Sequence, residues 1–209
     1  MYRLFFIVLF CGFSAFSLAQ GDAQIATALP DGRSSAELAV TWWQWVTDTP
    51  DASDPLADEA GNFCSYGQTE AVWFLSGSYS TEKVVRHCRI PAGRHIFFPV
   101  VNMMLWDGPG GQTCSQLQAD VKTAVDTVRN LEVEVDGKAI RNLQQYRYAT
   151  KECFNMPDDT DHYASDGYWV LLKPLGSGQH IIHFRGKIGD GGKTAEDFVQ
   201  DIEYIIEVE

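Results

Sequence analysis

Between residues 63 and 102, short apolar runs alternate with turn signals. The runs occupy residues 70–75, 83–90 and 95–101, and Ser-Gly-Ser and Pro-Ala-Gly segments at 76–78 and 91–93 separate them. Runs of this length that are rich in Val, Ile, Phe and Trp and are bounded by Gly, Pro and Ser are typical of β-strands. We therefore predict three strands of an antiparallel meander in this stretch.

A period of two returns in the second half of the chain. Residues 131–135 and 138–141 flank the pair Asp136-Gly137, a combination that favours a tight hairpin turn. Further strand-like segments are 146–148, 168–172, 179–186 and 198–208, and the last of these alternates apolar and acidic positions over most of its length.

Two stretches have a helical period instead, and each opens with a capping box, Ser34 with Glu37 and Thr113 with Gln116. The first helix is expected to end near Thr47, and the second has its apolar stripe at Leu117, Val121, Val125 and Val128. The indoles of residues 42, 43 and 45 would suit a sugar-stacking platform. Neighbouring positions lie about 100° apart around a helix, however, which favours a helix packed on the sheet.

About eight or nine short strands and two helices predict a mainly β fold, an antiparallel β-sandwich or jelly-roll with two packed α-helices. We assign residues 34–209 to this single domain. Residues 20–33 lack periodicity and are expected to form a flexible leader.

The N-terminus has the pattern of a secretory signal peptide. Arg3 precedes an apolar run from Leu4 to Phe16, and Ser17 and Ala19 supply the small residues of a cleavage site. The run is short for a membrane span, and a buried N-terminal helix is the alternative. We therefore expect residues 1–19 to be removed after Ala19 and the mature protein to be secreted or periplasmic.

Cleavage would leave an even number of cysteines, namely Cys64, Cys88, Cys114 and Cys153. On an exported chain this implies two disulfides with three possible pairings. We favour Cys64–Cys88, which would clamp neighbouring strands, with Cys114–Cys153, which would tie a helix start to a long loop. A zinc site is the alternative, but no two of these cysteines have the C-x₂₋₄-C spacing.

The chain is acidic, with a formal net charge of −12 at pH 7. Such a charge repels nucleic acid and anionic lipid head groups at long range, so both are disfavoured as partners. No segment after residue 19 has the composition of a membrane span.

Metal and cofactor signals are weak. The acidic loop 48–62 and the segment from Asp159 to Tyr163 have oxygen-rich side chains of the kind that calcium binds, but the latter lacks the Gly and Glu of a calcium loop. His95 follows Pro91-Ala-Gly93 as in a cupin, one residue earlier than the metal ligand of that motif. We therefore predict no metal or cofactor, with calcium as the one candidate.

Catalytic motifs are also missing from the sequence. The chain has no G-x-S-x-G segment, and pairing of its four mature cysteines would leave no free thiol as a nucleophile. The chain has so many acidic residues that pairs of carboxylates are expected by chance, so such a pair would not indicate catalysis. The sequence alone therefore favours a protein that is not an enzyme.

Six segments of the chain resemble a family of secreted bacterial proteins to which no activity is attached. They are WWQW (42–45), C-x₂-GQ-x₃-VWFL-x-G (64–77), C-x-IPAG (88–93), IFFPVVN (96–102), DGYW (166–169) and PL-x-x-G-x-H (174–180). The resemblance covers nearly the whole mature chain and implies export and a single domain. It implies no ligand and no catalytic residue, and Cys114 and Cys153 lie outside the matching segments.

Function is expected in the loops at one end of the sandwich, because rigid scaffolds usually carry their sites there. An aromatic face beside hydrogen-bonding groups suits a small polar ligand or a glycan. The candidate ligand-binding residues are Trp106, Asp107, Asp161, His162, Tyr163 and His95.

Three hypotheses follow for the function. The first is a non-catalytic binding or interaction domain for a small polar ligand, a glycan or another extracytoplasmic protein. The second is an extracytoplasmic hydrolase or lyase that uses His95, His162 or the acidic loops, with or without calcium. The third is a structural or assembly component without a small ligand.

Overall fold

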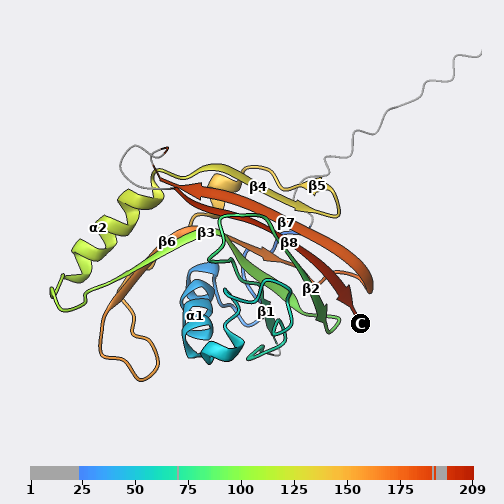
Figure 1. Ribbon diagram of the computed structural model, residues 1–209, viewed down its shortest axis with the longest axis horizontal. Coiled ribbons are helices and arrows are strands. Elements are labelled where there is room, and N and C mark those ends of the chain that lie inside the picture. The colour runs from blue at the N-terminus through green and yellow to red at the C-terminus, as the bar shows by residue number, and fades with distance from the viewer. Residues whose placement is uncertain (1–23, 70, 190, 192–196) are drawn as a thin grey trace, which may run out of the picture.

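A computed structural model describes residues 24–69, 71–189, 191 and 197–209 (Figure 1). The expected signal peptide lies outside these residues. The helices and strands are α1 (Ser35–Asp48), β1 (Val72–Phe74), β2 (Val84–Ile90), β3 (His95–Trp106), α2 (Cys114–Val125), β4 (Arg129–Val135), β5 (Lys138–Ala139), β6 (Tyr163–Leu172), β7 (Gly178–Ile188) and β8 (Phe198–Val208). Short 3₁₀ turns lie at Asp51–Ser53 and Leu143–Tyr146.

The strands form two packed sheets, of order β1-β3-β6 and β2-β8-β7-β4-β5. The prediction of a mainly β, sandwich-like fold with two helices is confirmed. Each sheet is mixed, however, because β1 pairs with β3 and β2 pairs with β8 in parallel. The antiparallel part of the prediction holds for the remaining pairs, including β3 with β6 and β7 with β8.

The three-stranded sheet is the middle layer of the molecule. One face packs on the other sheet, where the Phe98 and Phe184 rings stack with centroids 4.8 Å apart. The opposite face is covered by α1, whose Trp42 contacts the Trp169 ring edge-on at 5.3 Å. Strands covered on both faces need apolar residues at successive positions, which is why 72–75 and 96–101 are uninterrupted apolar runs.

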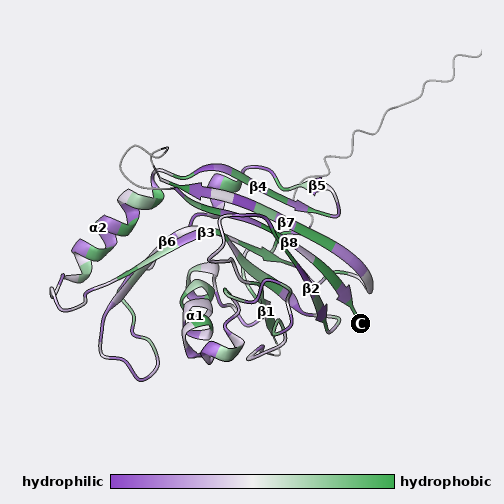
Figure 2. Ribbon diagram, viewed as in Figure 1, coloured by the Kyte–Doolittle hydropathy of each residue, from purple (hydrophilic) through white to green (hydrophobic). Residues whose placement is uncertain are grey.

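The five-stranded sheet has one face in solvent. Its strands therefore alternate between buried and exposed positions, as in β2, where each exposed residue follows a buried one. Figure 2 shows the same alternation of apolar and polar residues along β7 and β8. The inner positions include Ile182, Phe184, Ile202, Tyr204 and Ile206, all at most 2% exposed.

The predicted meander of residues 70–101 is wrong in its pairing. β2 leaves the sheet that contains β1 and β3 and becomes an edge of the other sheet, beside β8. Its alternating pattern suits the half-exposed sheet, whereas the continuous apolar runs of β1 and β3 suit the fully covered one.

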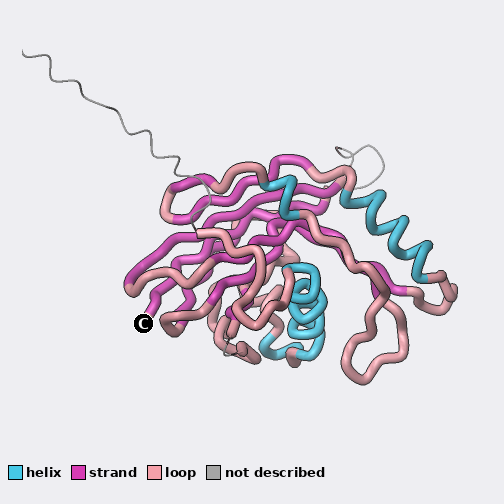
Figure 3. Tube along the Cα trace, turned by 180° about the vertical axis from the view of Figure 1, so that it is seen from behind, coloured by secondary structure: helices cyan, strands magenta, loops and turns pink. Residues whose placement is uncertain are grey.

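Both capping boxes form as predicted. The Ser34 and Thr113 hydroxyls accept the backbone N–H of Glu37 and Gln116, whose side chains return to the cap residues. Helix α2 packs through Leu117 and Val121 against Ala164 near the start of β6. Seen from behind, in Figure 3, α1 lies beneath the sheets and α2 extends beyond their end.

The hairpin at Asp136-Gly137 is also as predicted, with both residues at positive φ. Residues 146–148 were expected to continue the sheet, but only an isolated bridge forms, between Arg147 and Tyr168. The expected flexible leader is docked over its described part, residues 24–33. Ile25 forms a bridge with Leu172 and is buried in the core between the sheets, and Leu29 is buried on the α1 side.

Both disulfides have the predicted pairing, Cys64–Cys88 and Cys114–Cys153. Cys114 opens α2 and Cys153 lies in the long loop before β6, as expected. Cys64 lies in a loop rather than in a strand, so the first disulfide fastens that loop to β2. Disulfides are compatible with a location outside the cytosol.

None of the helices in the described part of the chain is long and apolar enough to cross a membrane.

Candidate functional site

Five of the six candidate residues lie together at the far end of the β3–β6 pair. Trp106 is the last residue of β3 and Tyr163 the first of β6, and the two are partners across the sheet. Asp107 and His162 are their neighbours in the chain. The loops that leave this end are joined by Cys114–Cys153. We call the group of Trp106, Asp107, Asp161, His162 and Tyr163 the loop site.

Asp107 and His162 hold each other in place. The Asp107 carboxylate accepts the His162 backbone N–H at 3.1 Å, and its second oxygen lies 3.1 Å from His162 Nδ1. The Asp107 N–H donates in turn to the His162 carbonyl. The bond from the His162 N–H contributes most to a pKa of Asp107 below its usual value. The imidazole remains 58% exposed, so its outer face is open to a ligand.

A hydrogen bond to the preceding loop holds the Tyr163 side chain in place. Its hydroxyl donates to Asp159 Oδ2 at 2.6 Å, and this bond is the first cause that raises the pKa of Tyr163 to about 12. Asp159 also accepts the Asp161 N–H at 2.9 Å. Desolvation, followed by the charges of Asp159 and Asp107, raises the pKa of Asp161. Tyr163 is thus a hydrogen-bonded support, and Asp161 is the carboxylate that is easiest to protonate in this acidic group.

Trp106 offers the largest open aromatic surface of the loop site. Its side chain is 50% exposed. Gly108, at φ +51°, lies so close that a Cβ there would come within 3.0 Å of the indole. The glycine therefore lets the loop fold back against part of the ring and leaves the rest free for stacking.

His95 lies apart from the other five, at the opposite end of β3. It borders a hollow formed by residues 25–30 with Lys173 and Pro174. Burial lowers the pKa of His95. His95 was grouped with the loop residues because of its cupin-like motif. The full length of β3 separates it from the loop site.

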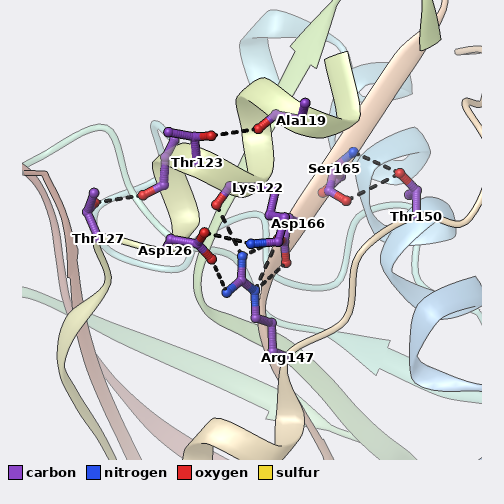
Figure 4. A network of polar contacts seen from close by, with 10 residues as sticks. Ala119, Lys122, Thr123, Asp126, Thr127, Arg147, Thr150, Ser165 and Asp166 are labelled. Carbon is purple, nitrogen blue, oxygen red and sulfur yellow. Dashed lines mark hydrogen bonds and ion pairs between the residues drawn. The ribbon is translucent and has the colours of Figure 1, made fainter. Parts of the chain in front are cut away.

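An ion-pair network links α2 to β6, one of the two strands that carry the loop site (Figure 4). Arg147 donates from Nε and Nη2 to the Asp166 carboxylate, at 2.6 Å for the shortest contact, and from Nη1 to Asp126 at 2.7 Å. Asp166 belongs to β6 and its side chain is 2% exposed, while Asp126 caps the end of α2. The bond to Asp166 is the main cause of a raised pKa at Arg147. The guanidinium therefore fixes α2 against β6, next to the loops.

Sequence reasoning missed a second feature, a cavity of about 370 Å³ between α1 and the outer part of β3. Trp42 and Trp43 of α1, Gly77 to Tyr79, Asn102 to Met104 of β3, and Phe198 and Gln200 of β8 border it. These segments are far apart in the sequence. Local sequence patterns do not predict such a cavity. The only related features in the sequence are the glycines Gly77 and Gly167, against which Gln200 and Asn102 pack closely.

Over the residues that the structure describes, no group of three or more His, Cys, Asp or Glu side chains is arranged to hold a metal ion.

No protein-family model matches this chain, and no curated protein does. Two solved structures show a distant likeness. A cysteine protease inhibitor from Entamoeba histolytica is 10% identical, over 68% of this chain and all of that chain, with a TM-score of 0.27. Amebosin is 12% identical, over 61% of this chain and 96% of that chain, with a TM-score of 0.20. Scores this low carry no argument about function.

Proposed function

We propose that this protein is a secreted or periplasmic, non-catalytic binding domain whose loop site takes a small polar ligand or a glycan. The observation that supports the proposal is the half-exposed indole of Trp106 next to the Asp107 carboxylate, which His162 holds in place, with Asp161 preceding His162 in the chain. Sugar rings have an apolar face that stacks on aromatic surfaces and hydroxyls that donate to carboxylates. Because the surrounding groups are acidic, a neutral glycan suits the site better than an anionic one.

A panel of neutral soluble polysaccharides in affinity electrophoresis tests the proposal. The wild-type protein is expected to be retarded by at least one of them, and Trp106→Ala is expected to lose most of that retardation, because stacking on an aromatic face supplies much of the affinity. Trp106 is half exposed, so the melting temperature of the variant should stay within a few degrees of the wild type.

Tyr66→Ala is the matched control, since Tyr66 is 44% exposed and lies outside the loop site. Equal retardation of the wild type and Trp106→Ala would contradict the proposal, as would a wild type that no glycan in the panel retards.

A hydrolase or lyase is the second candidate, favoured by the contact between His162 Nδ1 and Asp107 Oδ2. A carboxylate that orients an imidazole leaves Nε2 to act as a base. Any polysaccharide that binds should therefore be assayed for new reducing ends. If the wild type releases reducing ends and His162→Gln does not, the protein is an enzyme rather than a binding domain. If the polysaccharide stays intact, the binding-domain proposal is supported.

A further inference from the structure

The cavity between α1 and β3 owes its existence to a change in the face that β3 presents. The register of β3 against β6 shifts between Pro99 and Val101. Before the shift, Phe97 fills the α1 side and stacks on Trp169. After it, Asn102 faces Gly167 across the strands. Two large rings are thus replaced by an amide and a residue without a side chain, which leaves a hollow beneath α1.

Gly167 cannot be enlarged to close this hollow. A Cβ at Gly167 would lie 2.7 Å from the Cα and Cβ of Asn102 and 2.9 Å from the Val101 carbonyl. The close approach of the two backbones fixes both residues. The hollow is therefore built into the strand pair rather than left by loose packing.

The wall opposite β3 is also fixed. Gln200, 3% exposed, accepts the Ser78 N–H at 2.8 Å and donates to the Ser78 carbonyl at 2.7 Å. Gly77 lies so close that a Cβ would come within 2.1 Å of Gln200 Oε1. The buried Arg86 donates to the Gly77 carbonyl at 2.9 Å. A wall held by this many bonds keeps its shape without a ligand, which lowers the cost of ordering on binding.

The lining specifies an uncharged and mainly apolar ligand. None of the described residues that border the cavity carries a charge, although the chain as a whole has a net charge of −12. The indole rings, Leu56, Met104 and Phe198 supply the apolar surface. A volume of about 370 Å³ lies within the usual range of small-molecule pockets, roughly 300–1,000 Å³. Methionine side chains adapt to the shape of what they contact.

One polar group at the cavity is left without a partner. Trp43 Nε1 donates to Ser165 Oγ at 2.7 Å, and the Gln200 amide is committed to Ser78. Asn102 Nδ2, by contrast, is shielded from solvent and has no hydrogen-bond partner among the described residues. An unpaired buried donor costs free energy. Rotation about χ2, a broad torsion in asparagine, can turn the NH₂ group towards an acceptor in the cavity.

We propose that this cavity is a binding site for a small, uncharged, mainly apolar molecule with one carbonyl oxygen, such as an aryl or alkyl ketone or ester. The carbonyl accepts a hydrogen bond from Asn102, and the apolar body lies between α1 and Phe198. The site is distinct from the loop site and involves none of its residues.

The probe for the test is 6-propionyl-2-(dimethylamino)naphthalene, an uncharged fluorophore with one ketone whose emission shifts to the blue in apolar surroundings. The wild type is expected to bind it saturably with a blue shift. Thr47→Trp places an indole at the exposed rim of the cavity and is expected to weaken binding at least tenfold.

Thr41→Trp is the matched control. Thr41 and Thr47 both lie on α1, and each donates to the carbonyl four residues earlier, but Thr41 does not border the cavity. Binding by Thr41→Trp should equal that of the wild type. Absence of saturable binding by the wild type, or equal binding by Thr47→Trp, overturns the proposal.

Asn102→Leu tests the hydrogen bond, with 2-(dimethylamino)naphthalene as the partner probe that lacks the ketone. Loss of one neutral hydrogen bond should weaken binding of the ketone about fivefold and leave binding of the second probe unchanged. Equal effects on both probes overturn the role of Asn102. Near-ultraviolet circular dichroism verifies that each variant is folded before its binding is compared.

Discussion

Arg86 carries a positive charge into the core between loop and sheet. Its side chain is 1% exposed, and no acidic residue in the described ranges forms a salt bridge with it. The guanidinium instead donates to the carbonyls of Asp58, Ser76 and Gly77 and to the Tyr204 hydroxyl. It also lies 5.5 Å from the centroid of the Tyr204 ring. A charge buried in this way is stable only because each guanidinium nitrogen donates to an oxygen and the charge lies near an aromatic ring.

Arg86→Met is expected to lower the free energy of unfolding by about 3–5 kcal/mol, because it leaves several buried carbonyls unpaired. Arg86→Lys should also be destabilising, since an ammonium cannot reproduce the planar fork of a guanidinium. Urea unfolding measures both. Arg89→Met, which alters an exposed arginine of the same strand, is the control and should change little. A loss below about 1 kcal/mol for Arg86→Met would show that the carbonyls are solvated in the variant.

His180 makes stability depend on pH. Burial by itself lowers its pKa, but the bonds to the Asp136 carboxylate at 2.8 Å and to the Gly176 carbonyl outweigh this, so the net shift is upward. A raised pKa in the folded state means that protonated His180 stabilises the fold. That contribution is fully present below the unfolded pKa, about 6.5, and disappears as pH rises through the folded value.

His180→Gln should therefore destabilise the protein more at pH 5.5 than at pH 8.5, by up to about 1 kcal/mol for a partly exposed pair. Urea unfolding at the two pH values measures the difference. In an Asp136→Asn background, where the hairpin position at positive φ still suits its residue, the pH dependence of the effect should shrink. An effect that is equal at both pH values would assign His180 a role in packing alone.

Residues of the loop site were accessible to sequence reasoning, whereas Asn102 was not. Trp106, Asp107, His162 and Tyr163 stand out because aromatic and hydrogen-bonding groups in loops rarely serve the core. Their convergence follows from the register of a single strand pair. Asn102 lies inside an apolar strand, and its importance depends on a register shift and on a glycine 65 positions away, which no local pattern predicts.

Among the elements, those defined by short-range signals were predicted correctly. The two capping boxes, the Asp136-Gly137 turn and the cysteine pairs each depend on a few residues or on a small set of combinations. The strand that pairs with β2 was predicted incorrectly, because strands adjacent in sequence were assumed to pair. In addition, the charged Arg86 occupies an inward position of β2 and obscures the alternation that is typical of a half-exposed sheet.

The disulfide Cys114–Cys153 should matter to the loops beyond its effect on stability. Replacing both cysteines by Ser is expected to cost about 4 kcal/mol through loop closure and to speed amide hydrogen exchange in residues 107–113 and 152–162. Replacing Cys64 and Cys88 should cost a similar free energy, since the separations are 24 and 39 residues, but leave exchange in those loops unchanged. Equal exchange in both variants would show that the Arg147 network alone holds the loops.

For the whole molecule, the pattern of apolar positions in the sequence indicates which strands belong to which layer. Runs that are apolar at successive positions belong to the sheet enclosed by α1 and the other sheet, and alternating strands belong to the sheet with a solvent face. What could not be predicted is the space between layers. The cavity under α1 lies where side chains from five separate segments leave space unoccupied. Whether that space is filled depends on the sizes of all of these side chains together.

The position of β8 has a consequence for biosynthesis. This last strand lies inside the five-stranded sheet, with β2 on one side and β7 on the other, and every residue of β2 pairs with it. While a ribosome still holds residues 198–208, β2 has no neighbour to bond with, and its apolar side stays uncovered. The larger sheet can close only after residues 198–208 have left the ribosome, so the polypeptide made before them remains incompletely folded until β8 arrives.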